Sequence, residues 1–219
     1  SAEVLWGTTG QRLLHVSLVD DVQAPEAGRH LELRALDPAD GSLVCGMMIP
    51  DVAGATVLRY DDAQERVLVL PRSVEGAFDR VDLYDIANRV LVRSVTAQGE
   101  GPAALSPDGT MLLTSQSSAD GGELLAYSLA GDAPAAPLFW ELPAGTRVSS
   151  FAWSPSGQQV AYLVREGEDV AETDLAAQLG VWVIDMQTMA TFRSIAEEGS
   201  ESAVIAWTPD GSSILVYHS

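Results

Sequence analysis

The segment Leu105-Ser106-Pro107-Asp108-Gly109-Thr110-Met111-Leu112-Leu113 decides the fold, because it joins two strand-like stretches through a tight turn. In Ser-Pro-Asp-Gly, the proline presets φ at the first corner, the aspartate bonds back to nearby backbone, and the glycine accepts a positive φ. A large apolar residue, Leu105, precedes the turn, and an apolar run begins seven positions later. The pattern predicts an innermost strand, a turn and a second strand.

The same pattern recurs along the whole chain, which is the sign of a repeat architecture. Five apolar anchors share the seven-residue offset to the next apolar run, and they follow one another at intervals of 54, 45, 48 and 54 residues: Trp6, Tyr60, Leu105, Trp153 and Trp207. A four-stranded propeller blade takes about 40–50 residues, so one repeat corresponds to one blade. The copy after Tyr60 is the weakest, because it lacks the proline and the glycine.

Two further strands are expected in each complete repeat. The second strands, such as 160–164, are apolar on both faces, as expected for a sheet that is covered on both sides. The third strands are predicted at 30–36, 80–84, 123–127 and 180–184, and the fourth at 42–49, 89–95, 137–142 and 189–195. Asp37, Asp85, Ser128 and Asp185 follow the third strands and are interpreted as caps of the next turn.

The predicted fold is therefore an all-β, β-propeller domain built from four-stranded antiparallel blades. It spans residues 1–219, with blades at about 1–51, 52–98, 99–144 and 145–199 and a half blade at 200–219. Only 169–179 has a helical pattern, and a mobile acidic loop is an equal alternative there. Strand 214–217 would have an unpaired edge, so we expect the natural chain to continue, or the protein to self-associate through this incomplete fifth blade.

Three of the turns carry a family resemblance. Leu105-Ser106-Pro107-Asp108-Gly109, Trp153-Ser154-Pro155-Ser156-Gly157 and Trp207-Thr208-Pro209-Asp210-Gly211 resemble the WD40-like (TolB-type, PD40) propeller repeat of bacteria. The resemblance implies the fold for almost the whole chain. It does not imply one function, because this repeat serves periplasmic binding proteins, peptidase gating domains and many other proteins.

Charge excludes some classes of partner. The net charge is −19 and the pI about 4.2, whereas a nucleic-acid binder needs basic residues to neutralise phosphates. Anionic membrane surfaces are disfavoured for the same reason, and no apolar run approaches the roughly 18–20 residues of a membrane helix. Lysine is absent, which excludes lysine-based covalent catalysis, and the lone Cys45 rules out an internal disulfide.

No motif commits the chain to a reaction. There is no Gly-x-Ser-x-Gly nucleophile elbow and no glycine-rich phosphate loop, and the histidines (His15, His30 and His218) lack metal-ligand spacing. Trp140, Trp182 and the anchor tryptophans are interpreted as core residues rather than a stacking platform. No catalytic residue and no cofactor are expected.

One acidic stretch stands out as a candidate site. It holds five carboxylates in nine positions: Glu166, Glu168, Asp169, Glu172 and Asp174. A solvated acidic loop is the favoured interpretation, and the alternatives are a Ca²⁺ site or a contact for a basic partner. The spacing does not match an EF-hand loop.

The function expected from the sequence is a non-catalytic binding or scaffold module that presents loops to a protein or peptide partner. One alternative is the propeller portion of a larger hydrolase resembling the prolyl-oligopeptidase relatives. Another is an extracytoplasmic sensor domain. An extracytoplasmic location, periplasmic or at the cell surface, is favoured over a cytoplasmic one.

Overall fold

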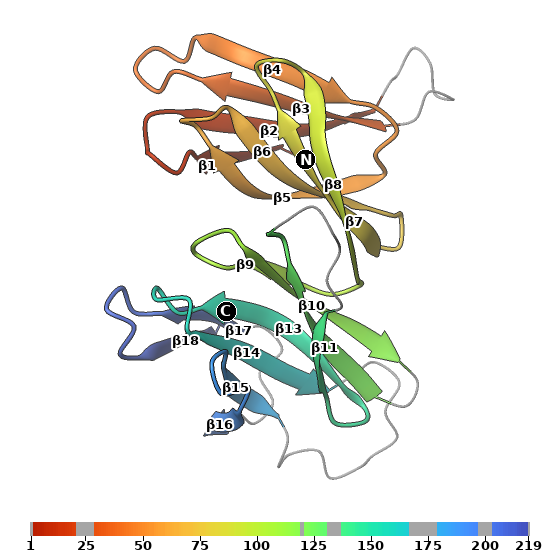
Figure 1. Ribbon diagram of the computed structural model, residues 1–219, viewed down its shortest axis with the longest axis vertical. Helices are drawn as coiled ribbons and strands as arrows, with labels where there is room; N and C mark the ends of the chain where they lie inside the picture. Colours follow the sequence, from red (N-terminus) through yellow and green to blue (C-terminus); the bar gives the residue numbers. More distant parts are fainter. Residues whose placement is uncertain are drawn as a thin grey trace. The chain divides into compact units, whose positions relative to one another are not determined.

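The structure is a computed structural model of the 219-residue chain, and it describes residues 2–20, 29–118, 121–130, 137–166, 179–196 and 203–218. Every helix or strand in these residues is a β-strand, and the strands form four four-stranded antiparallel sheets and one two-stranded sheet (Figure 1). This is the all-β blade architecture that the sequence predicted.

Each sheet is one blade, and its strands follow chain order. Blade 1 contains β1 (Ala2–Trp6), β2 (Leu13–Asp20), β3 (Arg29–Leu36) and β4 (Leu43–Ile49). Blade 2 contains β5 (Gly54–Asp61), β6 (Arg66–Arg72), β7 (Phe78–Asp85) and β8 (Val90–Gly99). Blade 3 contains β9 (Ala103–Leu105), β10 (Met111–Ser118), β11 (Gly121–Ser128) and β12 (Leu138–Glu141). Blade 4 contains β13 (Thr146–Trp153), β14 (Gln159–Glu166), β15 (Gly180–Asp185) and β16 (Thr191–Ala196), and the half blade contains β17 (Ala203–Trp207) and β18 (Ile214–His218).

The chain divides into two compact units, Ser1–Gln98 and Gly99–Ser219, and each is described here by itself. Unit 1 holds blades 1 and 2, and unit 2 holds blades 3 and 4 and the half blade. The third and fourth strands lie within a few residues of their predicted bounds in all four blades. The predicted helical stretch 169–179 falls outside the described residues except for its last position.

The turn between the first two strands is nearly identical in four of the five repeats. The amide of its glycine donates to the carbonyl of the residue after the anchor, at 2.9 Å from Gly109 to Ser106 and from Gly157 to Ser154, and at 2.8 Å from Gly211 to Thr208. All the glycines of these turns have positive φ, at 71°, 77°, 71° and 71° for Gly10, Gly109, Gly157 and Gly211. The Ser-Pro-Asp-Gly interpretation is confirmed, and Asp108 and Asp210 are turn formers that accept backbone amides within their own loops.

The polar residues after the third strands cap the next turn, as predicted. Asp37 accepts the amide of Ala39 at 2.8 Å, and Asp185 accepts those of Gln187 and Thr188 at 3.0 and 2.8 Å. Asp85 and Ser128 accept amides in the same way. These bonds fix where each fourth strand begins.

In unit 1, a buried carboxylate joins the two blades through hydrogen bonds. Asp62, which is 5% exposed, reaches from blade 2 into the first turn of blade 1. It accepts the Thr9 amide at 2.8 Å, the Thr9 hydroxyl at 2.6 Å, and the amides of Gln11 and Arg12 at 3.0 and 3.2 Å. In three of the other repeats, the hydroxyl of the Ser or Thr directly after the anchor accepts a backbone amide from the start of the second strand. The equivalent amide in blade 1 is that of Arg12. Blade 1 has Gly7 at the position of that Ser or Thr, so Asp62 takes over this role from the neighbouring blade.

In unit 2, anchor tryptophans connect successive innermost strands. Trp153 donates its indole N–H to the Ala104 carbonyl at 3.1 Å, and Trp207 donates to the Ala152 carbonyl at 2.9 Å. Each acceptor directly precedes the anchor of the previous repeat. The expectation that all anchors are buried was wrong, because only Tyr60 is buried. Leu105, Trp153 and Trp207 are partly buried, and Trp6 is 62% exposed.

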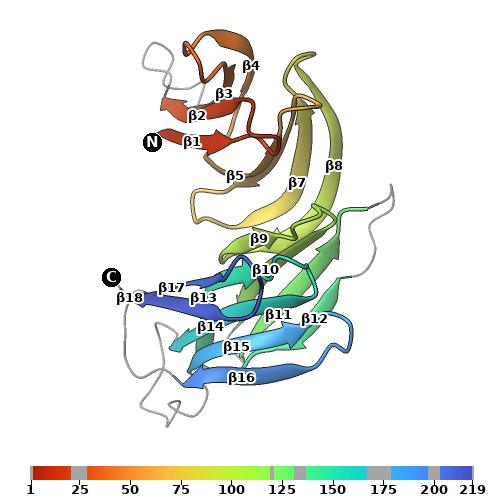
Figure 2. The same ribbon diagram turned by 90° about the vertical axis from the view of Figure 1, so that its left-hand side faces the viewer.

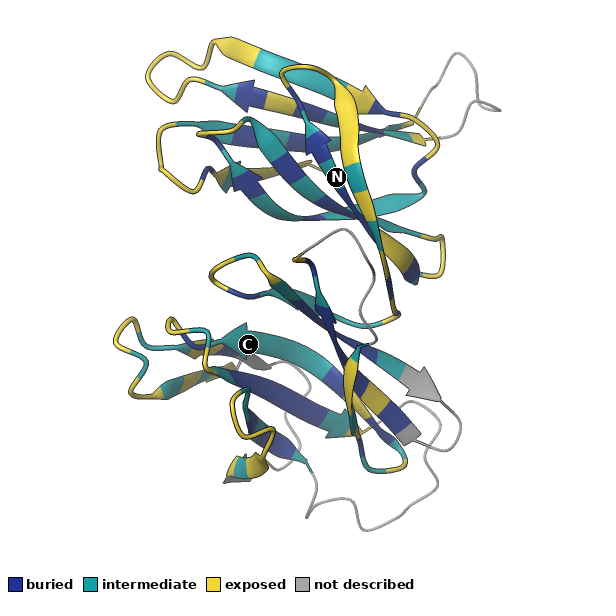
Figure 3. Ribbon diagram, in the orientation of Figure 1, coloured by how far each residue is buried: buried dark blue, intermediate teal, exposed yellow. Residues whose placement is uncertain are grey.

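Burial is greatest on the middle strands of the blades and least on the outermost ones (Figure 3). On β14, Val160–Val164 are all buried, because residues on both faces meet apolar clusters. On β8, the residues Val90, Leu91 and Val92 are exposed. The fourth strands therefore carry much of the exposed apolar surface that a partner could cover.

Candidate binding pocket of unit 2

A pocket of about 280 Å³ lies in unit 2 and is lined by residues of blades 3 and 4. Figure 2 labels β12 of blade 3 beside β15 and β16 of blade 4. Its lining comes from β12 and the residues after it, β14, β15 and β16. The lining residues are Trp140, Glu141, Leu142, Pro143, Tyr162, Val164, Trp182 and Thr191. Three of the eight are large aromatic residues with a polar tip.

Strand register explains why these aromatic residues meet. Tyr162 on β14 lies opposite both Phe151 on β13 and Trp182 on β15, so a row of aromatic residues crosses blade 4. Because side chains alternate along a strand, Leu163 and Val181 point to the other face, where they pack in a separate cluster. Tyr162 and Trp182 are thus directed toward blade 3.

Trp140 closes the pocket from blade 3. It lies opposite Leu124 on β11, and it packs against the same apolar cluster as Tyr162 and Trp182. Its indole N–H donates to the carbonyl of Met189 at 3.4 Å, a long hydrogen bond to the turn between β15 and β16. That turn is itself fixed, because the Met189 amide donates to the Asp185 carbonyl at 2.8 Å.

The Tyr162 hydroxyl is one of the polar groups that a ligand in this pocket can contact. The side chain is 5% exposed, and the hydroxyl has no hydrogen-bond partner among the described residues. Burial raises the pKa of Tyr162 to about 12, so the group is a neutral phenol at physiological pH. The phenol can therefore donate a hydrogen bond to a ligand in the pocket or accept one from it.

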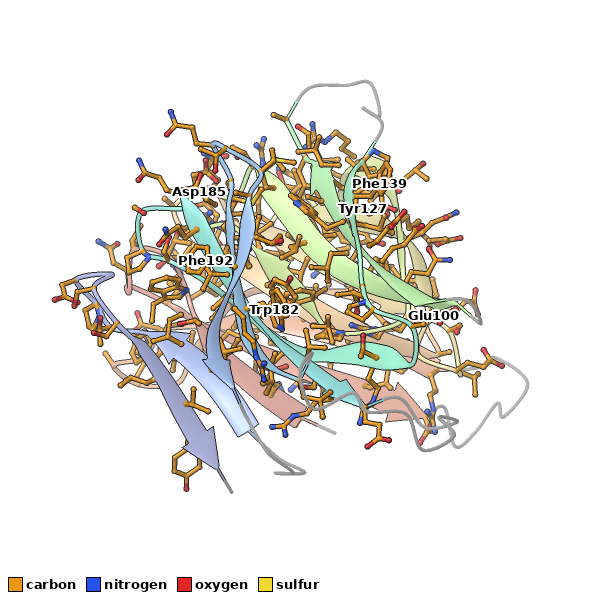
Figure 4. The ribbon with its side chains drawn as sticks, turned by 90° about the horizontal axis from the view of Figure 1, so that it is seen from below. Glu100, Tyr127, Phe139, Trp182, Asp185 and Phe192 are labelled. Carbon is orange, nitrogen blue, oxygen red and sulfur yellow. The ribbon has the colours of Figure 1, made fainter. Side chains whose placement is uncertain are left out.

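Large apolar side chains are also exposed on the outer strands of blades 3 and 4. Phe139 on β12 is 62% exposed, and Leu138 and Phe192 are exposed as well. Figure 4 labels Trp182 and Phe192 on adjacent strands of blade 4 and Phe139 on blade 3. Because side chains alternate along a strand, Phe139 and Phe192 lie on the faces opposite to the pocket residues Trp140 and Thr191, so they expose apolar surface outside the pocket.

The pockets of unit 1 offer less to a ligand. One pocket of about 480 Å³ lies along β4, and its two arginines already have partners. Arg34 pairs with Glu32 at 2.6 Å, and Arg89 donates to the Gly46 carbonyl at 3.1 Å. Another, beside Asp51 and Val74, is about 570 Å³ and open. The unit 2 pocket is the better candidate, because it combines aromatic walls with an unpartnered hydroxyl.

Cys45 lies in a polar cluster of unit 1 that does not activate it. The Glu65 carboxylate accepts the Cys45 thiol at 3.3 Å and the Tyr60 hydroxyl at 3.0 Å, and it forms an ion pair with Arg12. Burial and the Glu65 carboxylate raise the pKa of the Cys45 thiol to about 11. A thiol held protonated is a poor nucleophile, so this cluster joins blades 1 and 2 without favouring covalent chemistry.

The acidic stretch proposed from the sequence is only partly described. Glu166 is exposed at the end of β14, and Glu168, Asp169, Glu172 and Asp174 lie outside the described residues. Within the described ranges, no three His, Cys, Asp or Glu side chains cluster closely enough to hold a metal ion. His15 and His30 lie on β2 and β3, as the strand predictions required. The described residues include no helix of the length and hydropathy needed to cross a bilayer.

Comparison with known proteins supports the fold. No family model matches the chain, and no curated protein matches it. Among solved structures, hydrazine synthase from Kuenenia stuttgartiensis is 14% identical, with a TM-score of 0.64 over 97% of this chain and 60% of that one. The β-propeller domain of the Trilobed protease from Pyrococcus furiosus, described as having an open velcro topology, is 11% identical, with a TM-score of 0.59 over 99% and 63%. TolB from Acinetobacter baumannii is 13% identical, with a TM-score of 0.54 over 97% and 48%.

These likenesses show that the chain has a β-propeller fold made of repeats. The chain spans less than two thirds of each of these structures, and the identities are too low to carry more than the fold.

The sequence predicted that Trp140 and Trp182 are core residues, and the structure shows that they also line a pocket. Both are partly buried and pack against the apolar cluster, yet both also line the pocket. The signal that could have found them is the run Leu138-Phe139-Trp140 on an outermost strand, where an apolar side chain on either face is unusual.

Proposed function

We propose that this protein is a non-catalytic binding module that holds a protein or peptide partner at the aromatic pocket of unit 2. The observation that carries the proposal is a pocket walled by Trp140, Tyr162 and Trp182, in which the neutral Tyr162 hydroxyl adds a polar group. Trp and Tyr are the residues that most often dominate binding energy at protein interfaces.

The size of the pocket supports a partner that inserts one side chain. Its volume of about 280 Å³ is at or below the range of roughly 300–1,000 Å³ usual for small-molecule sites. We also infer that the repeat belongs to the WD40-like (TolB-type, PD40) group, which the Ser-Pro-Asp-Gly turns and the likeness to TolB support.

The experiment is peptide selection on the whole chain, followed by affinity measurements. A random displayed library is selected against the protein, and the enriched peptides are titrated into the unaltered chain and two variants. Trp182→Ala is expected to weaken binding by tenfold or more, about 1.4 kcal/mol. The matched control is Trp6→Ala, which removes an exposed tryptophan from unit 1 and is expected to leave affinity unchanged. Peptides that bind both variants with the affinity of the unaltered chain would refute the proposal.

A second candidate function is that of a propeller portion of a larger hydrolase. The likeness to the propeller domain of the Trilobed protease favours it. The test is the full coding sequence. A Gly-x-Ser-x-Gly motif in a strand–turn–helix context outside these 219 residues would support this function, and a coding sequence without a hydrolase segment would exclude it.

A further inference from the structure

We propose that the side chain accepted by the aromatic pocket of unit 2 is an arginine, carried by a basic segment of the partner. This inference rests on the proposed function and adds to it the chemistry of the ligand. Three features support it: the aromatic walls, the exposed Glu141 among the lining residues and the neutral hydroxyl of Tyr162.

The walls suit a flat cation. Trp140, Tyr162 and Trp182 all line the pocket, and a guanidinium is attracted by the negative face of an indole or a phenol. Arginine is less strongly hydrated than lysine, and its planar group stacks on aromatic rings. Arginine also has an aliphatic stem, which can lie along Leu142 and Val164 at the same site.

The charge at the rim has the matching sign. Glu141 lines the pocket and is exposed, and it lies directly opposite Glu123 in the β11–β12 register. The chain as a whole carries a net charge of −19, which steers a basic partner toward the protein.

Cationic side chains of the protein leave room for this assignment. Arg193 lies opposite Trp182 on β16, and its Nη2 donates to the Leu179 carbonyl at 2.6 Å. Arg147 donates to the Glu166 carbonyl at 3.2 Å, on the first strand of blade 4. Both guanidinium groups are engaged with backbone, and neither is among the residues that line the pocket.

The hydroxyl of Tyr162 supplies an acceptor for the guanidinium. A phenol oxygen can accept an N–H as well as donate its own proton, whereas a tryptophan N–H can only donate. Arginine therefore meets an acceptor, aromatic faces and a negative rim in one pocket. A neutral ligand would use only part of this set.

The test uses two small probes of almost the same shape, Nα-acetyl-arginine amide and Nα-acetyl-citrulline amide, titrated into the whole chain and followed by tryptophan fluorescence. The urea of citrulline is planar but uncharged, so we expect it to bind about 3- to 30-fold more weakly than the guanidinium. Glu141→Gln should weaken the arginine probe and leave the citrulline probe unchanged. Tyr162→Phe should weaken the arginine probe without lowering the stability of the fold, because the hydroxyl makes no hydrogen bond to another described residue.

The outcomes separate this inference from the proposed function. Equal affinity for the two probes, lost from both in Trp182→Leu, would overturn the arginine assignment while the pocket remained a binding site. Stronger binding of Nα-acetyl-trimethyllysine amide than of the arginine probe would also overturn it, because a quaternary ammonium would then be the preferred cation. Library peptides whose affinity is unchanged when Trp182 is replaced would refute the proposed function itself.

Discussion

Replacing Asp62 with asparagine tests the contact that joins blades 1 and 2. The carboxylate accepts three backbone amides and a hydroxyl from the first turn of blade 1. Burial opposes its ionisation, but the hydrogen bonds from Thr9 and Gln11 outweigh burial and lower the pKa of Asp62 to about 2. Compared with an unfolded value of about 3.9, this shift corresponds to roughly 2–3 kcal/mol of stability. In Asp62→Asn, the NH₂ group of asparagine would also face the backbone N–H donors of blade 1. We therefore expect the free energy of unfolding to fall by about 2–4 kcal/mol in total.

The assay is urea unfolding of the whole chain, with Asp79→Asn as the control for the same change at an exposed carboxylate of unit 1. Because the folded pKa of Asp62 is lowered, its contribution is present above about pH 4 and is lost as the pH falls toward 2. The difference in unfolding free energy between the unaltered chain and Asp62→Asn should therefore shrink over that pH range. The other carboxylates contribute equally to both chains, so they do not affect the difference. A difference below about 0.5 kcal/mol at pH 7, the level of an ordinary surface substitution, would refute the reasoning.

Three further results are expected. In Gly7→Ala the new Cβ would lie 2.3 Å from Cγ of Asp62, so the variant should lose stability comparably to Asp62→Asn, and the double variant should lose much less than the sum in unfolding titrations. The pKa of the Cys45 thiol, raised to about 11, should make alkylation at pH 8 at least about tenfold slower in the folded chain than in the chain unfolded in urea, and Glu65→Gln should accelerate it. On β18, Tyr217 is 68% exposed in a two-stranded sheet, so we expect concentration-dependent self-association in light scattering and a decrease in Tyr217→Lys; a concentration-independent monomer would contradict this.

The strands and turns could be predicted from the sequence because each depends on local chemistry. The positive φ of Gly109 and the capping of the following turn by Asp185 depend on neighbouring residues in the sequence and not on how the blades pack. The pocket could not be predicted, because it depends on register between strands far apart in sequence. Nothing in the sequence around Tyr162 shows that Trp182 lies opposite it, or that Trp140 covers both from another blade.

The contact through Asp62 escaped the sequence reading for the same reason. Asp61-Asp62 resembles a degraded copy of the turn motif, and only the fold shows that Asp62 replaces a hydroxyl that Gly7 lacks. Local rules thus predict elements, whereas contacts between repeats require the assembled blades.

The central claim, that the aromatic pocket of unit 2 is the binding site, is tested most directly by the indole N–H signals of the whole chain in ¹H–¹⁵N NMR. The five tryptophans give five signals: Trp6, Trp140, Trp153, Trp182 and Trp207. Titration with an enriched library peptide should shift Trp140 and Trp182 in a saturable way and leave Trp6, in unit 1, where it is. Saturable shifts confined to the other three tryptophans, or no shift at a saturating concentration, would contradict the assignment of function to this pocket.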